Sequence, residues 1–253
     1  MFKRLFTKEQ VKPSVPDGIR VYAVGDIHGR ADLLEQTLQM IDRDSQDILP
    51  AARQIIFLGD YVDRGPASAD VIDVLIALRS LWPNVHTLGG NHEELFQLVL
   101  EGNDRANQQF AMVGGRETAL SYGIDPQAYE RSSWDELHQL IINSVPPSHI
   151  EFLSQLELSV EIGDYFFVHA GVRPKVALAD QEASDLRWIR ESFLKSNADF
   201  TKMIVHGHSI SSDVDFRRNR IGIDTGAYRT GHLTTLILEG TNQRVFQTAG
   251  DQG

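Results

Sequence analysis

The sequence contains no cysteine among its 253 residues. This absence excludes disulfide bonds, thiolate metal sites and a cysteine nucleophile. It agrees with a reducing compartment, and we expect the protein to be cytoplasmic. Any bound metal ion must therefore be held by histidine, carboxylate or amide side chains.

Long hydrophobic runs and an excess of basic residues are also lacking. No apolar stretch approaches the ~18–20 residues that a membrane span needs, and residues 1–10 have no apolar segment of the kind found in signal peptides. We therefore expect no membrane span. The chain has 24 Lys and Arg against 35 Asp and Glu, a net charge of −11. Because such a chain repels a phosphate backbone at long range, general nucleic-acid binding is not expected.

The spacing of apolar residues predicts an α/β fold. In the first hundred residues, strands are expected at 19–24, 54–58 and 84–88, and helices at 30–43 and 67–81. Alternation of strand and helix is typical of sheets whose strands are at least partly parallel.

The middle of the chain, about residues 93–157, has few strand signals and is predicted to be a helical insertion. Its expected helices lie near 108–121, 134–143 and 148–156. Later strands are expected at 158–162, 165–168, 202–205, 220–223, 233–238 and 244–247. No linker divides the chain, so we expect one domain over residues 1–253.

Short polar segments follow five of the predicted strands at their carboxyl ends. They are Gly25-Asp26-Ile27-His28-Gly29, Gly59-Asp60-Tyr61-Val62-Asp63-Arg64-Gly65, Gly90-Asn91-His92-Glu93, His169-Ala170-Gly171 and His206-Gly207-His208. Ligands of α/β sheets bind beyond these strand ends. Carboxylate, imidazole and amide oxygen are hard or borderline metal ligands. Each segment alone is more often a polar turn, but five with the same ligand chemistry favour one metal site.

Together the segments resemble the bacterial phosphoprotein phosphatase (serine/threonine phosphatase) family of the binuclear metallophosphoesterases. Its pattern is GDxHG, GDxxDRG, GNHE, HAG and a late GH, and all occur here in order. Residues 223–227 also resemble a closing strand of bacterial members, so the likeness covers about residues 19–240. It implies a sandwich of two mixed β-sheets flanked by helices, with the active site on loops at the strand ends.

The resemblance implies two divalent metal ions, with manganese expected and iron or zinc as alternatives. The first ion would be held by Asp26, His28 and Asp60. The second would be held by Asp60, Asn91, His169 and His208. His206 remains an alternative ligand. A neutral amide at Asn91 keeps such a centre net positive, which suits a phosphate anion.

The mechanism inferred is direct attack on phosphorus by a metal-bridging hydroxide. His92 is the candidate general acid, and Asp63 would orient its ring and raise its pKa. The substrate phosphate would be bound by Arg64, Asn91 and Arg190, with Arg187 in reserve.

The leading functional hypothesis is a phosphomonoesterase that acts on phosphoserine or phosphothreonine in proteins, so that the partner is a phosphorylated protein or a small phosphoester substrate. A symmetrical bis(5'-nucleosyl)-tetraphosphate hydrolase is the alternative within the fold, and an inactive metal-binding interaction module the alternative outside it. Residues 101–157 hold three basic and nine acidic residues, a poor setting for a long polyphosphate. Gly89 departs from the family, where arginine often precedes GNHE.

Overall fold

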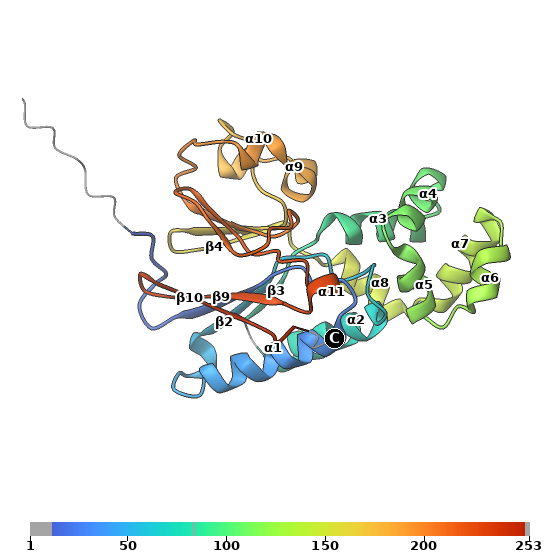
Figure 1. Ribbon diagram of the computed structural model, residues 1–253, viewed down its shortest axis with the longest axis horizontal. Coiled ribbons are helices and arrows are strands. Elements are labelled where there is room, and N and C mark those ends of the chain that lie inside the picture. Colours follow the sequence, from blue (N-terminus) through green and yellow to red (C-terminus); the bar gives the residue numbers. More distant parts are fainter. Residues whose placement is uncertain (1–11, 83, 251–253) are drawn as a thin grey trace, which may run out of the picture.

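The computed structural model describes residues 12–82 and 84–250, so residues 1–10, expected to lack a signal peptide, lie outside the described part. Two five-stranded mixed sheets stack face to face with helices outside them (Figure 1), which confirms the predicted sandwich. The first sheet has the order β10-β9-β1-β2-β3, and the second has the order β4-β5-β6-β8-β7. The strands are β1 (Arg20–Val24), β2 (Arg53–Phe57), β3 (Val85–Thr87), β4 (Ser159–Ile162), β5 (Tyr165–Val168), β6 (Met203–His206), β7 (Asp215–Phe216), β8 (Arg220–Gly222), β9 (Thr234–Glu239) and β10 (Asn242–Gln247).

The helices fall into three groups along the chain. Those that follow the first strands are α1 (Ala31–Asp44) and α2 (Ser68–Leu81), with a short 3-10 turn η1 (Pro50–Ala52). Those between β3 and β4 are α3 (Asn91–Leu100), α4 (Asp104–Met112), α5 (Gly115–Ser121), α6 (Pro126–Arg131), α7 (Trp134–Ser144) and α8 (Pro147–Ser154). Those beyond β5 are η2 (Leu178–Asp180), α9 (Ala183–Trp188), α10 (Glu191–Leu194) and α11 (Ala227–Thr230).

Each sheet contains a parallel set of three strands. In the first sheet β1 pairs parallel with β2, and β2 with β3. In the second sheet β5 pairs parallel with β6, and β6 with β8. Parallel strands end at the same edge, so the polar segments that follow them are brought together there.

Strand β1 shows how the alternation of side chains builds two cores. Val21 and Ala23 belong to the core between the two sheets. Tyr22 and Val24 belong to the core beneath helices α1 and α2. Because successive side chains of a strand point to opposite faces, a fully buried strand reads as a continuous apolar run.

The predicted helical insertion is present as α3–α8, which gather at one end of the sandwich (Figure 1). The single helix expected at 108–121 is instead two, α4 and α5, separated at Gly114. That residue has a φ of 107°, a left-handed conformation that glycine adopts easily and that ends a helix. Helix α3, which begins in the GNHE segment, was not predicted, and neither were the short elements α6, β7, α9, α10, α11, η1 and η2. Across the described ranges, no helix has the length and hydrophobicity needed to cross a bilayer.

Candidate metal centre and active site

The site lies on the loops that leave β1, β2, β3, β5 and β6. All five polar segments converge there, and the GNHE segment opens helix α3 at Asn91. The predicted metal ligands are buried, as is the candidate acid His92. These polar side chains therefore lie inside the protein and need partners that replace water.

Several site residues have a strained backbone. Seven non-glycine residues in the described part of the chain have a positive φ, and five of them are predicted site residues or ligands. These five are His28 (48°), Asp60 (51°), Asp63 (70°), Arg64 (69°) and His208 (62°). Such conformations cost ~1–3 kcal/mol each and gather at functional sites, where the surrounding structure must hold them.

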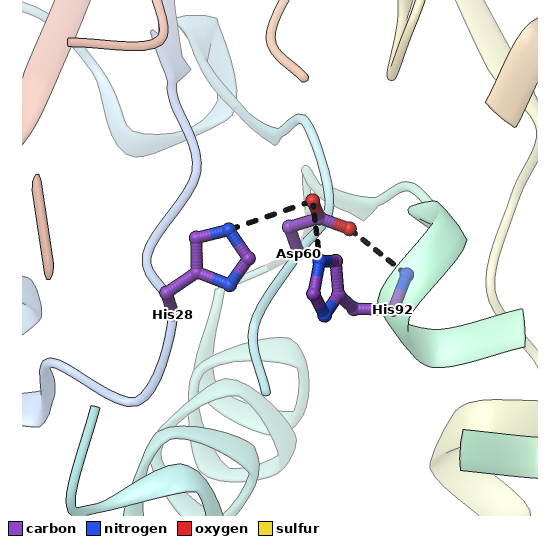
Figure 2. Close-up of side chains that lie close together, drawn as sticks. All are labelled: His28, Asp60 and His92. Carbon is purple, nitrogen blue, oxygen red and sulfur yellow. Dashed lines mark hydrogen bonds and ion pairs between the residues drawn. The ribbon is translucent and has the colours of Figure 1, made fainter. Parts of the chain in front are cut away.

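The first cluster of candidate metal ligands is formed by His28, Asp60 and His92 (Figure 2). Their ligand atoms all lie within 4.8 Å of one another. His28 Nδ1 lies 2.9 Å from the carbonyl oxygen of Val62 and donates to it, so Nε2 carries the free lone pair. That Nε2 atom is buried 3.6 Å from Asp60 Oδ2, and it has no hydrogen-bond partner among the residues that the structure describes. Burial lowers the pKa of His28 to about 3, which keeps the ring neutral as metal ligation requires.

The second cluster is formed by Asp60, His169 and His208, again with ligand atoms within 4.8 Å of one another. His169 Nε2 lies 3.4 Å from Asp60 Oδ1 and 3.1 Å from Asn91 Oδ1. His208 Nε2 is buried and has no hydrogen-bond partner in the described part of the chain. Burial together with the charge of His169 lowers the pKa of His208 to about 2. Asp60 thus directs one oxygen toward each cluster, as a bridging ligand would.

The unpartnered Nε2 atoms of His28 and His208 fit a metal centre. Buried polar atoms without partners are rare in folded proteins and call for an explanation such as an ion. Here both are neutral imidazole nitrogens beside a shared carboxylate, a donor set suited to divalent transition metals. The residues present therefore fit two divalent cations.

Asp26 is placed differently from the other predicted ligands. Its carboxylate accepts from the backbone N–H of His208 at 3.0 and 3.2 Å and lies beside Asp224, which sequence reasoning did not assign to the site. Burial and the charges of Asp224 and Asp60 raise the pKa of Asp26 well above its usual range. Two carboxyl groups buried together disfavour ionisation of both, and a nearby cation would relieve this repulsion.

His206 faces away from both clusters. Its Nδ1 lies 3.0 Å from the carbonyl oxygen of Gly207, and its Nε2 lies 3.5 Å from Arg220 Nη1. The ring packs edge-on against Phe193, with centroids 5.0 Å apart. Of the two late histidines, His208 is therefore the one placed among the candidate ligands.

His92 contacts both Asp63 and Arg64. Its Nδ1 lies 2.6 Å from Asp63 Oδ2, and its Nε2 lies 3.1 Å from Arg64 Nη2. Because arginine has no acceptor, Arg64 donates to Nε2 and the ring donates from Nδ1 to Asp63. Burial lowers the pKa of His92, but the charges of Asp60 and Asp63 outweigh burial, so the net shift is upward.

Glu93 is a site residue that sequence reasoning left without a role. Its buried carboxylate accepts the backbone N–H groups of Asp60, Tyr61, Val62 and Gly90, at 2.8, 2.7, 3.2 and 2.9 Å. It therefore holds the loop after β2 against the start of α3. Its role could have been inferred from the sequence, because Glu93 stands three residues after Gly90, the spacing of a helix capping box.

The two candidate phosphate-binding arginines differ in their partners. Arg190 is exposed and has no side-chain hydrogen bond or ion pair within residues 12–82 and 84–250, and its charge helps to lower the pKa of His208. Arg187 Nη1 pairs with Glu94 Oε1 at 2.9 Å. A Cβ atom on Gly89 would lie 3.5 Å from Arg187 Nε, so this guanidinium fills the space beside Gly89.

Comparison with known proteins identifies the family to which the chain belongs. Residues 19–229 match the family of calcineurin-like phosphoesterases. The asymmetrical bis(5'-nucleosyl)-tetraphosphatase PrpE of Anoxybacillus flavithermus is 24% identical over 233 residues, which cover 84% of this chain and 88% of that protein. Serine/threonine-protein phosphatase 2 of Escherichia coli is 26% identical over 222 residues, which cover 85% and 90%.

A solved structure described as a putative diadenosine tetraphosphatase has the same fold. It superposes with a TM-score of 0.62 at 20% identity, over 96% of this chain and 100% of that one. The relatives thus divide between dinucleotide hydrolases and protein phosphatases at low identity, and they share the metallophosphoesterase scaffold. On this family match, and with the two buried ligand clusters, the chain belongs to the calcineurin-like phosphoesterases and is a metal-dependent phosphoesterase.

Proposed function

We propose that this chain is a phosphomonoesterase that acts on phosphoserine and phosphothreonine in proteins. The observation that carries the proposal is the buried pair of His92 and Asp63, which lies beside Arg64 and against the ligand Asp60. This pair can donate a proton to a leaving oxygen. Of the phosphoesters considered, alkyl esters of serine and threonine need that proton most, because an alkoxide is a poor leaving group.

The proposed ligands of the first metal ion are Asp26, His28 and Asp60, and those of the second are Asp60, Asn91, His169 and His208. When bound, a pair of divalent cations supplies Lewis acidity and lowers the pKa of water at the site. We propose manganese as the activating metal, with iron or zinc as alternatives. Carboxylate and imidazole ligands accept all three ions.

Arg64 and Arg190 are the proposed phosphate-binding side chains, with Asn91 beside them. Arg64 now donates to His92 Nε2 and lies with its Cζ 4.9 Å from the ring centre of Tyr228. Transfer of the Arg64 guanidinium to a phosphate oxygen would release His92 Nε2 to carry the proton for the leaving group. Phosphate binding by Arg64 would thus also make His92 Nε2 available for protonation.

Hydrolysis of dinucleoside tetraphosphates is the second candidate, and an exposed indole favours it. Trp188 is 37% exposed and stands in sequence between Arg187 and Arg190. In this second candidate function the indole would stack on a base, and the two arginines would bind the polyphosphate chain. The indole nitrogen of Trp188 donates to Glu94. Against this candidate, the insertion is acidic, and the leaving group of a nucleotide anhydride needs little protonation from His92.

A substrate comparison separates the two candidates. We expect kcat/KM for a phosphothreonine peptide to exceed that for diadenosine tetraphosphate under one metal condition. Trp188→Ala serves as the matched variant, because it removes the stacking surface and none of the proposed metal ligands or phosphate-binding residues. A clear preference of the parent enzyme for the dinucleotide, lost on Trp188→Ala, would overturn the proposal in favour of the second candidate.

A further inference from the structure

Helix α5 of the insertion contacts the loop that carries Asp63 and Arg64. The backbone N–H of Arg64 donates to the carbonyl oxygen of Gly114 at 3.1 Å. A Cβ atom on Gly114 would lie 2.7 Å from that Arg64 nitrogen, and its φ of 107° also favours glycine. The approach of the insertion to the Asp63 loop therefore depends on a residue without a side chain.

Thr118 of α5 contacts Asp63 at two points. Its Oγ1 donates to Asp63 Oδ1 at 2.7 Å and accepts the backbone N–H of Asp63 at 2.8 Å. The direction of the first bond is fixed, because an ionised carboxylate can only accept. The Ser68 hydroxyl lies 3.0 Å away and donates to Thr118, whose only proton is already used. Every hydrogen-bonding site of this buried hydroxyl is thus assigned.

The two oxygens of Asp63 consequently have different partners. Oδ1 accepts from Thr118, and Oδ2 accepts from His92 Nδ1 at 2.6 Å. With both oxygens held, the plane of the carboxylate is fixed, and so is the His92 ring that donates to it. The backbone of Asp63 is in the left-handed region with a φ of 70°, and the bond from its N–H to Thr118 helps to hold it there.

We propose that Thr118 is a positioning residue for the acid His92, acting through Asp63, and that the helical insertion is therefore part of the catalytic apparatus. The proposal rests on the acid role of His92 in the proposed function. Loss of the Thr118 hydroxyl frees the Asp63 carboxylate to rotate, which misaligns the His92 ring. Proton donation to the leaving oxygen should suffer, while phosphate binding by the arginines should not.

The test compares Thr118→Val, which keeps the shape of the side chain and removes the hydroxyl, with Thr118→Ser, which keeps the hydroxyl. Ser121→Ala is the matched control. Ser121 Oγ accepts the N–H of Ala69 at 3.1 Å, so this side chain joins α5 to the start of α2 without contacting Asp63. Each variant is assayed on a phosphothreonine peptide and on p-nitrophenyl phosphate. Metal content and melting temperature are measured on the same preparations.

For Thr118→Val we expect kcat on the peptide to fall roughly 10-fold or more, part of the effect of general acid catalysis, with KM and metal content little changed. The loss on p-nitrophenyl phosphate should be several times smaller. Thr118→Ser should retain most of the activity, and Ser121→Ala should match the parent enzyme. If Thr118→Val does not fold, Thr118→Ala removes the same hydroxyl and supplies the same comparison.

Equal losses of Thr118→Val on both substrates, or a loss for Ser121→Ala as large as that for Thr118→Val, would overturn the positioning role. His92→Asn, assayed in parallel, distinguishes failure of the positioning role of Thr118 from failure of the acid role of His92. If His92→Asn shows the dependence on leaving group and Thr118→Val does not, only the role of Thr118 fails. If His92→Asn loses equally on both substrates, the acid role fails and the positioning proposal fails with it.

Discussion

His92 Nδ1 lies 2.6 Å from Asp63 Oδ2, and both side chains are buried. A histidine held in this way has a fixed ring orientation and keeps its other nitrogen for chemistry. That other nitrogen, His92 Nε2, lies 3.9 Å from Asp60 Oδ2, and Asp60 belongs to both ligand clusters. The proposed acid and the metal centre are therefore one connected assembly.

Replacement of His92 by asparagine should slow turnover of a phosphothreonine peptide by roughly 10²–10⁴-fold, the usual contribution of a general acid. The effect on p-nitrophenyl phosphate should be much smaller, because nitrophenolate leaves without a proton. Steady-state kinetics on both substrates measure this difference. Elemental analysis of the same preparations is the control, since His92 also lies within the first ligand cluster. Loss of metal from His92→Asn would show that His92 is a ligand and not the acid.

Removal of the Asp63 charge should change the pH dependence of kcat. The carboxylates of Asp60 and Asp63 raise the pKa of His92 against the opposing effect of burial. The acid form of His92 is lost as pH rises through its pKa, so kcat should fall on the alkaline side. In Asp63→Asn that fall should move to lower pH, by roughly 1–3 units for the loss of one adjacent charge. An unchanged alkaline limb in pH profiles of kcat would contradict the pairing.

The late histidines should differ in their effect on metal content. His208→Ala removes a nitrogen from the second cluster and should reduce occupancy of about one of the two ions. His206→Ala should leave occupancy close to that of the parent, because its ring faces Arg220 and Phe193. Elemental analysis of both proteins decides the matter, and the opposite pattern would mean that the ligand is His206.

Replacement of Arg190 should impair phosphate binding more than replacement of Arg187. Arg190→Ala should lower kcat/KM roughly 10–100-fold, equivalent to the ~1.5–3 kcal/mol of a hydrogen bond to a charged group. Arg187→Ala should have a smaller effect on affinity for the phosphate, because its guanidinium is paired with Glu94. Inhibition constants for inorganic phosphate provide a readout independent of turnover. Weaker phosphate binding by Arg187→Ala than by Arg190→Ala would reverse the assignment.

Much of the scaffold could be predicted because its signals are local. Apolar runs such as 54–58 mark buried strands, and the glycines that follow them mark the turns where polar ligands begin. The break between α4 and α5 was missed although Gly114-Gly115 is a local helix-breaking signal. The close approach of Gly114 to the Arg64 backbone is a tertiary contact. Local sequence gives little information on such contacts.

The pairing of His92 with Asp63 was predicted from the motifs, whereas other contacts within the site depend on tertiary packing and were not predicted. Thr118 contacts Asp63 across 55 positions of sequence, and neither residue type nor spacing indicates it. The same holds for the pairing of Asp26 with Asp224 and for the placement of Arg187 beside Gly89. These contacts depend on the loops that the two sheets bring together in the folded chain.

Removal and return of metal test the central claim most directly. The purified protein is treated with chelator, dialysed and analysed for metal, and its hydrolysis of p-nitrophenyl phosphate is measured before and after manganese is added. We expect the metal-free protein to lose at least roughly 10²-fold in activity, because water at the site then keeps its ordinary pKa, and to regain activity with about two ions bound per chain. Full activity in a preparation shown to be free of metal would contradict the account.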